Sequence, residues 1–269
     1  MIKLNSDELK GFTSHSSKGN QLKWKKDDIW YKADYTGYEG LSEYVISMLL
    51  TKSDLAPNEY IIYDTEKIQY KHTIFNGSKS SDFLQNGCQL ITLSRLYNIK
   101  YNRDFTKDLW HIQDIPERLL FLVDNVIRLT NLKDFGLYLS KMLTIDALFL
   151  NEDRHLHNIA VLMNEDGTFD YCPFFDHGAG LLADTTMDYP LGIDIYKLID
   201  DVKAKTISSD FDEALDVVEK QFGQNLHFHF NKSDVTNILN QDTFYDNNIK
   251  LRVQDIIYEQ MRKYQYLFK

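Results

Sequence analysis

Hydrophobic and polar positions change their spacing near residue 90, and the two parts of the chain predict different elements. In the first part, "DDIWYKADY" at 27–35 predicts a strand after a charged turn. The segments "EYIIYD" at 59–64 and "IQYKHTIF" at 68–75 predict the two strands of a β-hairpin, separated by "TEK". Between the first and second of these strands, "LSEYVISMLLTK" at 41–52 has apolar residues at helical spacing, with Glu43 off the apolar stripe. This part therefore predicts a small sheet with one helix.

From about residue 114 onward the apolar residues recur at helical spacing. Helices are predicted for the apolar-periodic segments at 114–132, 135–150, 210–223 and 248–268. Asp114 is a candidate N-cap for the first of these helices, and Pro116 fits its first turn. Gly223 stands where a glycine commonly ends a helix. The second part of the chain is therefore predicted to be mostly helical.

One short hairpin is predicted among these helices. The strings "NIAVLM", "NEDG" and "TFDYCPFF" at 158–175 fit a strand, a turn and a second strand, with Asp-Gly at 166–167 as the hairpin signal. The polar cluster "NEDRHLHN" at 151–158 fills the junction between the preceding apolar helix and this hairpin. Taken alone, such a cluster is also typical of a polar turn that ends a helix and starts a strand.

Composition and charge exclude several classes of function. The chain has 269 residues and a formal net charge of −10, which disfavours general binding to the phosphate backbone of nucleic acids. The N-terminus has no apolar signal segment, and no apolar stretch approaches the roughly 20 residues that a membrane-spanning helix needs. Cys88 and Cys172 lack a C-x-x-C spacing. We therefore expect reduced thiols in a cytoplasmic protein that binds no membrane.

Asp153, Asn158 and Asp176 occur in the order of the catalytic segment of phosphoryl-transfer enzymes of the protein-kinase type. The first two are five positions apart, and Asp176 follows the predicted hairpin in "FFDHGAGLL" at 174–182. In such enzymes one carboxylate orients the attacking hydroxyl. An amide oxygen and a second carboxylate hold Mg²⁺ against the nucleotide phosphates. The order therefore predicts a magnesium–nucleotide site.

Lys32 and Glu43 are candidates for the ion pair that positions phosphates in kinases, because the lysine lies in a predicted strand and the glutamate in the next helix. Glu39 competes for this role, but it lies between glycines in a predicted turn, so Glu43 is preferred. The alternative is a solvent-facing lysine and a surface glutamate. Upstream, the polar segment at 13–25 offers backbone amides that can cover phosphates, although as a lone feature it fits an ordinary loop.

Other site types fit the sequence less well. His155 and His157 are two positions apart, which is not a recognised zinc spacing, and the chain has no H-E-x-x-H. A simpler role for His155 is to support the loop through a hydrogen bond, whereas Arg154 is either structural or faces substrate. Neither G-x-x-x-x-G-K-[ST] nor G-x-S-x-G occurs, which argues against a P-loop NTPase and an α/β-hydrolase.

The strings "NEDRHLHNIAVL" and "PFFDHGAGL" resemble the catalytic loop and metal-binding motif of HipA-like serine/threonine kinases, which are bacterial and include toxins of toxin–antitoxin modules. The D-R-H-x-x-N string is also similar to the loop of phosphatidylinositol 3/4-kinases. "YKAD" and "LSEYVISMLL" fit the family's lysine and glutamate. The resemblance spans about 14–180. It implies an α+β, bilobal protein-kinase-like fold, with a small β-rich N-lobe at 1–90 and a mostly helical C-lobe at 91–269.

The resemblance further implies an ATP- and Mg²⁺-dependent kinase that phosphorylates serine or threonine of a protein. Asp153 would be the catalytic base, and Lys32, held by Glu43, would contact the phosphates. Asn158 and Asp176 would bind Mg²⁺ and the nucleotide. The loop residues that would cover the nucleotide are Ser16, Ser17, Lys18 and Gly19.

Regulation and partners are also implied by the resemblance. A serine of the phosphate-binding loop, among Ser14, Ser16 and Ser17, would be autophosphorylated, and an antitoxin protein would be a partner. The chain resembles compact members without an extra N-terminal subdomain, and His177 stands where ordinary protein kinases have phenylalanine. Adenine is expected to meet the connection at 74–90. Two alternatives remain, a lipid or small-molecule kinase of the same fold and a nucleotide-binding pseudokinase scaffold.

Overall fold

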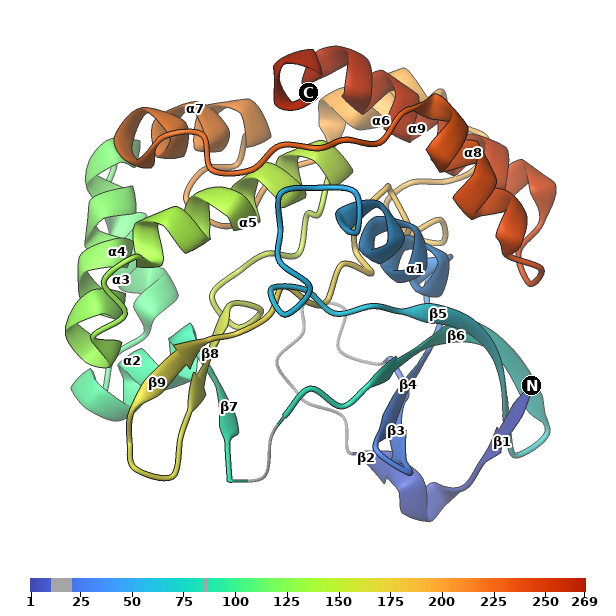
Figure 1. Cartoon of the computed structure of the whole chain (residues 1–269), viewed down its shortest axis with the longest axis horizontal. Helices are drawn as coiled ribbons and strands as arrows, with labels where there is room; N and C mark the ends of the chain where they lie inside the picture. Colours follow the sequence, from blue (N-terminus) through green and yellow to red (C-terminus); the bar gives the residue numbers. More distant parts are fainter. Residues whose placement is uncertain (11–20, 85–86) are drawn as a thin grey trace.

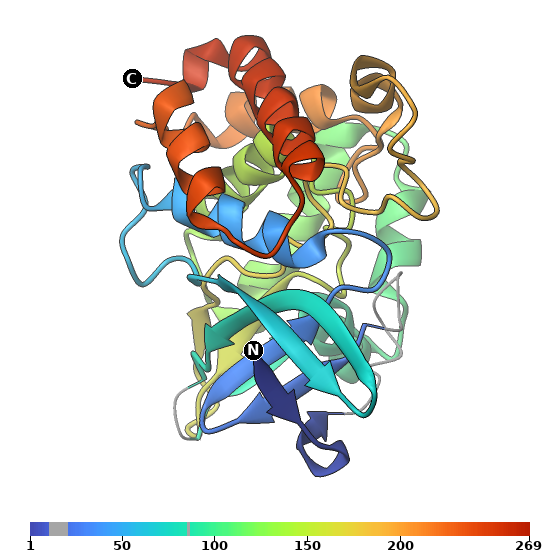
Figure 2. The same ribbon diagram turned by 90° about the vertical axis from the view of Figure 1, so that its right-hand side faces the viewer.

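The structure, a computed structural model, describes residues 1–10, 21–84 and 87–269 and has two lobes (Figure 1). Within these residues, six strands of the N-lobe form one curled sheet in the order β1-β5-β6-β4-β3-β2. The strands are β1 (Ile2–Leu4), β2 (Leu9–Lys10), β3 (Lys23–Lys26), β4 (Ile29–Ala33), β5 (Asp64–Tyr70) and β6 (Thr73–Ser81). Figure 2 shows the strong curl of this sheet. A small apolar core of its own includes Leu4, Trp24, Tyr31 and Ile68.

The predicted hairpin of the N-lobe is wrong in the position of its turn and of its strands. The structure pairs β5 with β6 through a turn at Lys71–His72, so "TEK" lies inside β5 and 59–63 lies outside the sheet. Lys71 has a φ of 54°, the left-handed conformation that such a tight turn requires. The segment 59–63 is extended because it follows the other lobe, where Ile61 N–H donates to the carbonyl of Phe174 at 3.0 Å. Strand-forming residues here serve a contact between lobes.

Helix α1 (Glu39–Leu50) joins the sheet to the larger lobe and is buried on nearly every side. Its apolar residues belong to the large core of the C-lobe, whereas its first turn lies against β6. Asp34 accepts a hydrogen bond from the Gly40 N–H at 2.7 Å and so satisfies one free amide of the first turn. This hydrogen bond and the packing of the first turn fix the angle at which α1 crosses the sheet, so that Glu43 faces β4.

The close approach of α1 to β6 depends on two glycines. A Cβ on Gly40 would lie 2.4 Å from the carbonyl carbon of Gly77 and 2.7 Å from its Cα. We therefore expect Gly40→Ala to lower the free energy of unfolding by about 1–3 kcal/mol, because the helix must move off the sheet. Urea unfolding followed by circular dichroism measures the change. Gly192→Ala is the matched control, since a Cβ there would meet nothing within 4 Å. An unchanged midpoint in Gly40→Ala would show that the helix shifts without penalty.

The C-lobe contains the predicted helices and hairpin. Its helices are α2 (Leu93–Tyr101), α3 (Phe105–His111), α4 (Ile115–Thr130), α5 (Phe135–Phe149), α6 (Ile195–Asp201), α7 (Phe211–Phe222), α8 (Lys232–Gln241) and α9 (Asn247–Lys263). A second sheet has the order β7 (Gln89–Thr92), β8 (Ala160–Met163) and β9 (Phe169–Tyr171). Asp114 caps α4 by accepting the Glu117 N–H at 2.8 Å, and α7 ends before Gly223, whose φ is 82°. These predictions are confirmed.

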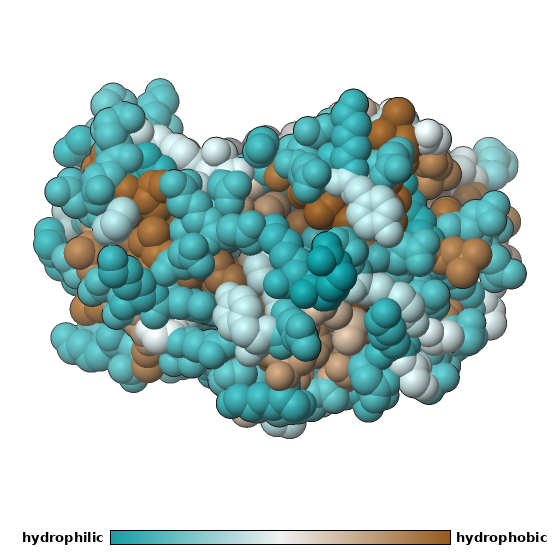
Figure 3. Space-filling view, turned by 90° about the horizontal axis from the view of Figure 1, so that it is seen from above, coloured by the Kyte–Doolittle hydropathy of each residue, from teal (hydrophilic) through white to brown (hydrophobic). Residues whose placement is uncertain are grey.

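A membrane-spanning helix is absent from the part of the chain described above. None of the helices there is both long enough and apolar enough to cross a bilayer. Seen from above, the molecule is mostly hydrophilic, with apolar residues in separate patches (Figure 3).

Candidate active site

A cavity between the two lobes brings together the three polar residues of the predicted catalytic segment. Asp153, Asn158 and Asp176 all line it, although they come from two different loops. The remaining lining residues come from β3 and the residues just before it, from the turn before α1 and its first residue, and from the segment after Asp176: Gln21, Lys23, Tyr35, Thr36, Glu39, Gly178, Ala179 and Asp184. The lining combines acidic side chains with a lysine and small residues, which suits a phosphate–metal group.

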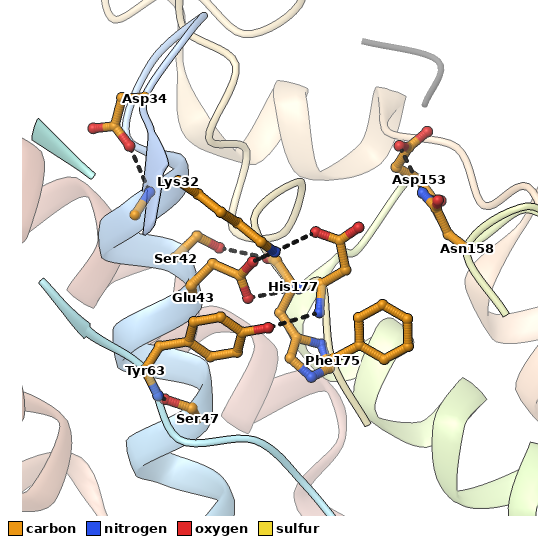
Figure 4. Close-up of polar contacts among 12 residues, drawn as sticks. Lys32, Asp34, Ser42, Glu43, Ser47, Tyr63, Asp153, Asn158, Phe175 and His177 are labelled. Atoms are coloured by element: carbon orange, nitrogen blue, oxygen red, sulfur yellow. Dashed lines mark hydrogen bonds and ion pairs between the residues drawn. The ribbon is translucent and has the colours of Figure 1, made fainter. Parts of the chain in front are cut away.

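The loop after α5 holds Asp153 and Asn158 in a fixed relation. Helix α5 ends at Phe149, and the next residue, Leu150, has a φ of 53° and turns the chain out of the helix. Asn158 then donates through its Nδ2 to the backbone oxygen of Asp153 at 2.9 Å and to its Oδ2 at 3.0 Å (Figure 4). Because both bonds use the amide nitrogen, the Oδ1 of Asn158 is left as an oxygen ligand. The carboxylate of Asp153 is nearly buried, and Asn158 fixes the position of its Oδ2.

Lys32 lies between two carboxylates, and one of them belongs to Asp176, which lines the cavity. Its Nζ is 2.6 Å from Glu43 Oε1 and 2.8 Å from Asp176 Oδ1. Burial alone would lower the pKa of Lys32, but the charges of Asp176 and Glu43 outweigh it and hold this pKa well above its usual value. Burial likewise would raise the pKa of Asp176, and the charge of Lys32 holds it well below its usual range. Lysine and aspartate are therefore both ionised.

Glu43 also connects this pair to the loop that carries Asp176. Its Oε2 accepts the His177 N–H at 2.8 Å, so one carboxylate binds a strand lysine and the backbone of the second loop. Glu39, the competing candidate, has a different position. It begins α1 and accepts hydrogen bonds from the N–H groups of Thr36 at 2.7 Å and Gly37 at 3.1 Å. Glu39 therefore stabilises the turn before the helix.

Arg154 is buried behind the two loops and joins them. Its Nε lies 3.0 Å from Asp146 Oδ2 on α5, and its Nη1 donates to the carbonyls of Asn158 at 3.1 Å and Phe175 at 3.0 Å. Its Nη2 lies 3.3 Å from His177 Nδ1. The sequence left open whether Arg154 is structural or faces substrate, and its 2% exposure makes it structural.

Tyr63 is a residue of the site that the sequence did not indicate. Its hydroxyl accepts the Asp176 N–H at 3.4 Å, and its ring lies 5.2 Å from Lys32 Nζ, within reach of a cation–π interaction (Figure 4). Ser42 of α1 adds a further tie, because its hydroxyl contacts the carbonyls of His177 and Gly180, each at 3.0 Å. Contacts between segments so far apart in the chain leave no local sequence signal.

The two histidines of the polar cluster at 151–158 contact different partners. His155 Nε2 lies 3.4 Å from Asp153 Oδ1, and its Nδ1 accepts the His157 N–H at 3.2 Å. His157 Nε2 instead lies 3.3 Å from Ser94 Oγ on α2. Among the residues that the structure describes, no group of three histidine, cysteine or acidic side chains is arranged to hold a metal ion.

The oxygen ligands of the cavity suit Mg²⁺ nevertheless. Asn158 offers an amide oxygen and Asp176 a carboxylate, and both line one cavity. Mg²⁺ prefers such hard ligands and commonly takes only one or two from the protein, with substrate phosphates and water completing its shell. The donor set therefore fits Mg²⁺ bound together with a nucleotide.

Two predicted parts of the site cannot be placed in full. Ser16, Ser17, Lys18 and Gly19 of the expected phosphate-binding loop, and Ser14 beside them, lie outside the described residues. The expected adenine contact at 74–90 comprises β6, the connection that follows and the start of β7, and two residues of that connection, 85 and 86, are likewise outside.

His177 is expected to make folding depend on pH. Burial and the Arg154 charge hold the pKa of His177 well below its usual value, so the native state keeps the imidazole neutral. The unfolded chain protonates it near its ordinary pKa of about 6.5. Stability is thus lost as pH falls below about 6.5, by up to about 1.4 kcal/mol per pH unit. Urea unfolding at several pH values should show this loss reduced in His177→Asn. Equal slopes in both proteins would contradict the assignment.

Comparisons with known proteins bear on the fold. No protein-family model matches the sequence. A search of curated proteins also gave no match. Among solved structures, the Helicobacter pylori proinflammatory kinase CtkA matches with a TM-score of 0.63 and 17% identity, over 98% of this chain and 94% of that chain. The Shewanella oneidensis toxin HipA, solved with HipB and operator DNA, matches with a TM-score of 0.44 and 11% identity, over 95% and 62%. The predicted bilobal α+β architecture is confirmed, and the chain has a kinase fold.

Proposed function

We propose that the protein is an ATP- and Mg²⁺-dependent kinase that phosphorylates serine or threonine of a protein substrate. One observation carries the proposal. Asp153, Asn158 and Asp176 line a single cavity, and Asp176 contacts Lys32, which is paired with Glu43. Each role that phosphoryl transfer requires then has a side chain of suitable chemistry in a suitable place. The proposed lobes comprise residues 1–90 and 91–269.

The roles follow from the positions of these groups. Lys32, held by Glu43, would contact the nucleotide phosphates, and Asp153 would accept the proton of the attacking hydroxyl. The hydroxyl oxygen forms a bond to the γ-phosphorus, while the bond from that phosphorus to the β–γ bridging oxygen breaks and ADP leaves with the electron pair. Asn158 and Asp176 would hold Mg²⁺, which neutralises phosphate charge when bound. Catalysis would come mainly from positioning and charge neutralisation.

The test is transfer of phosphate from labelled ATP with Mg²⁺ to cell proteins, followed by identification of the modified residues. Label on serine or threonine that is absent with Asp153→Ala would support the proposal. Label on lipids or small molecules would favour the alternative kinase classes. Nucleotide binding without any turnover would favour a pseudokinase scaffold. If the protein neither binds ATP nor transfers phosphate, the proposal is excluded.

The finer expectations stay predictions. Autophosphorylation among Ser14, Ser16 and Ser17 can be checked by mass spectrometry of the wild type beside Asp153→Ala. Equal phosphate on those serines in both proteins would show that another kinase modifies them.

An antitoxin partner can be checked by co-purification with the neighbouring gene product.

A further inference from the structure

Lys205 places a positive charge beside the proposed catalytic base. Its Nζ lies 3.9 Å from Asp153 Oδ1 and 3.9 Å from Glu152 Oε2. The lysine comes from the segment between α6 and α7, far along the chain from the catalytic loop. Its side chain is 39% exposed, whereas Ala204 and Thr206 on either side are 6% and 2% exposed. Lys205 therefore projects from a buried segment toward Asp153, which lines the cavity.

The backbone around Lys205 is fixed to the elements that support the catalytic loop. The Thr206 hydroxyl donates to the carbonyl of Arg154 at 2.5 Å, which ties the segment directly to that loop. Arg118 of α4 donates to the carbonyl of Ile207 at 2.5 Å. Because these anchors are buried, the position of the lysine relative to Asp153 is set by the fold and not by a flexible surface loop.

A buried carboxylate holds the lysine on its other side. Glu152, which is 5% exposed, accepts a hydrogen bond from the Tyr189 hydroxyl at 2.7 Å. Burial raises the pKa of Tyr189, so this hydroxyl stays protonated and keeps donating. Lys205 therefore lies near one buried glutamate and one aspartate of the cavity, as Lys32 does, but at 3.9 Å from Glu152 its ion pair is looser than the 2.6 Å pair of Lys32 and Glu43.

A cation beside Asp153 would offset negative charge in the cavity. Glu39, Asp153, Asp176 and Asp184 line the cavity together with the cation Lys23, and a γ-phosphoryl group brings further negative charge toward Asp153. Charges a few ångströms apart in a site partly shielded from water repel strongly, and preorganised cations offset this repulsion in the transition state. Lys32 is already held by the carboxylates of Glu43 and Asp176. Lys205 lies beside Asp153, the proposed base, to which the acceptor hydroxyl would be bound.

We propose that Lys205 is a catalytic residue whose ammonium group contacts the γ-phosphoryl group during transfer. The inference rests on the proposed function, since it assumes that ATP binds with its γ-phosphate near Asp153. The ammonium acts through charge and hydrogen bonds and exchanges no proton. The bonds made and broken at phosphorus, and the proton accepted by Asp153, are unchanged by its presence.

Three variants test the proposal. Lys205→Ala is expected to lower kcat about 100-fold, the usual effect of removing one donor aimed at transition-state charge. Lys205→Arg, which keeps the charge, should retain more of the activity. Lys203→Ala is the matched control, because Lys203 is exposed on the same segment and should leave kcat unchanged. Calorimetry with Mg²⁺ should show weaker binding of a non-hydrolysable ATP analogue to Lys205→Ala but unchanged binding of ADP.

The two nucleotides separate a catalytic role from a structural one. If Lys205→Ala weakens ADP and the ATP analogue equally, the lysine only supports the loop and the proposal is overturned. An unchanged kcat in Lys205→Ala would overturn it as well. If the wild type binds nucleotides but transfers no phosphate, the proposed function fails. The effect of Lys205→Ala on the affinity for the ATP analogue, compared with its effect on the affinity for ADP, still shows whether Lys205 contacts the γ-phosphate. A wild type that binds neither nucleotide would overturn both.

Discussion

Asp153→Asn is expected to lower kcat about 1000-fold, within the range that a positioned general base contributes. Asparagine has the same size, and its side-chain oxygen can still accept the hydrogen bond that Asn158 donates to Asp153 Oδ2 at 3.0 Å. The loop should therefore keep its shape while it loses the group that accepts the proton. Steady-state phosphate transfer from ATP measures kcat, and KM for ATP should change little because Asp153 faces the acceptor hydroxyl.

An exposed aspartate on the same lobe provides the control. Asp124 lies on the outer face of α4, so Asp124→Asn removes one negative charge far from the cavity and should leave kcat as it is. Unfolding of both variants in urea should show that stability is not the cause. If Asp153→Asn keeps the wild-type kcat, Asp153 is not the base and the proposed mechanism is wrong.

Elements with local signals could be predicted from the sequence. Helices α4 and α7 carry an aspartate N-cap, an apolar stripe and a defined end, and each signal lies within a few residues of the helix. The spacing of Asp153, Asn158 and Asp176 is local in the same sense, because one short hairpin separates the two loops. The structure brings all three to one cavity.

Features that depend on distant contacts could not be predicted. The segment 59–63 has strand-forming residues, which predicted a strand of the N-lobe hairpin. The segment lies against Phe174 of the C-lobe instead. Lys205 meets Asp153 only because Thr206 is bonded to Arg154, which is 52 residues away in the chain. Nothing in the residues beside Lys205 marks this contact. Such pairings follow from packing of the whole lobe, and local patterns carry no information about them.

Arg154→Leu is expected to lower the free energy of unfolding by about 3–5 kcal/mol, the effect of removing one partner of a buried ion pair. Asp146 is 2% exposed and would lose its guanidinium partner, while the carbonyls of Asn158 and Phe175 would lose donors. Urea unfolding measures the change. Arg103→Leu is the control, because the Arg103–Asp108 pair is exposed and such pairs contribute only about 0–1 kcal/mol.

The destabilisation caused by Arg154→Leu should also depend on pH with a definite sign. Burial raises the pKa of Asp146, and the charge of Arg154 opposes this rise. Without the arginine, the folded-state pKa of Asp146 moves further above its unfolded value of about 4. Stability associated with the protonated carboxyl is then present at low pH and lost as pH rises through the folded pKa. The variant should therefore lose more stability at pH 8 than at pH 5, and Asp146→Asn added to it should remove that difference. A loss that is equal at both pH values would show that the buried carboxylate is stabilised by something other than Arg154.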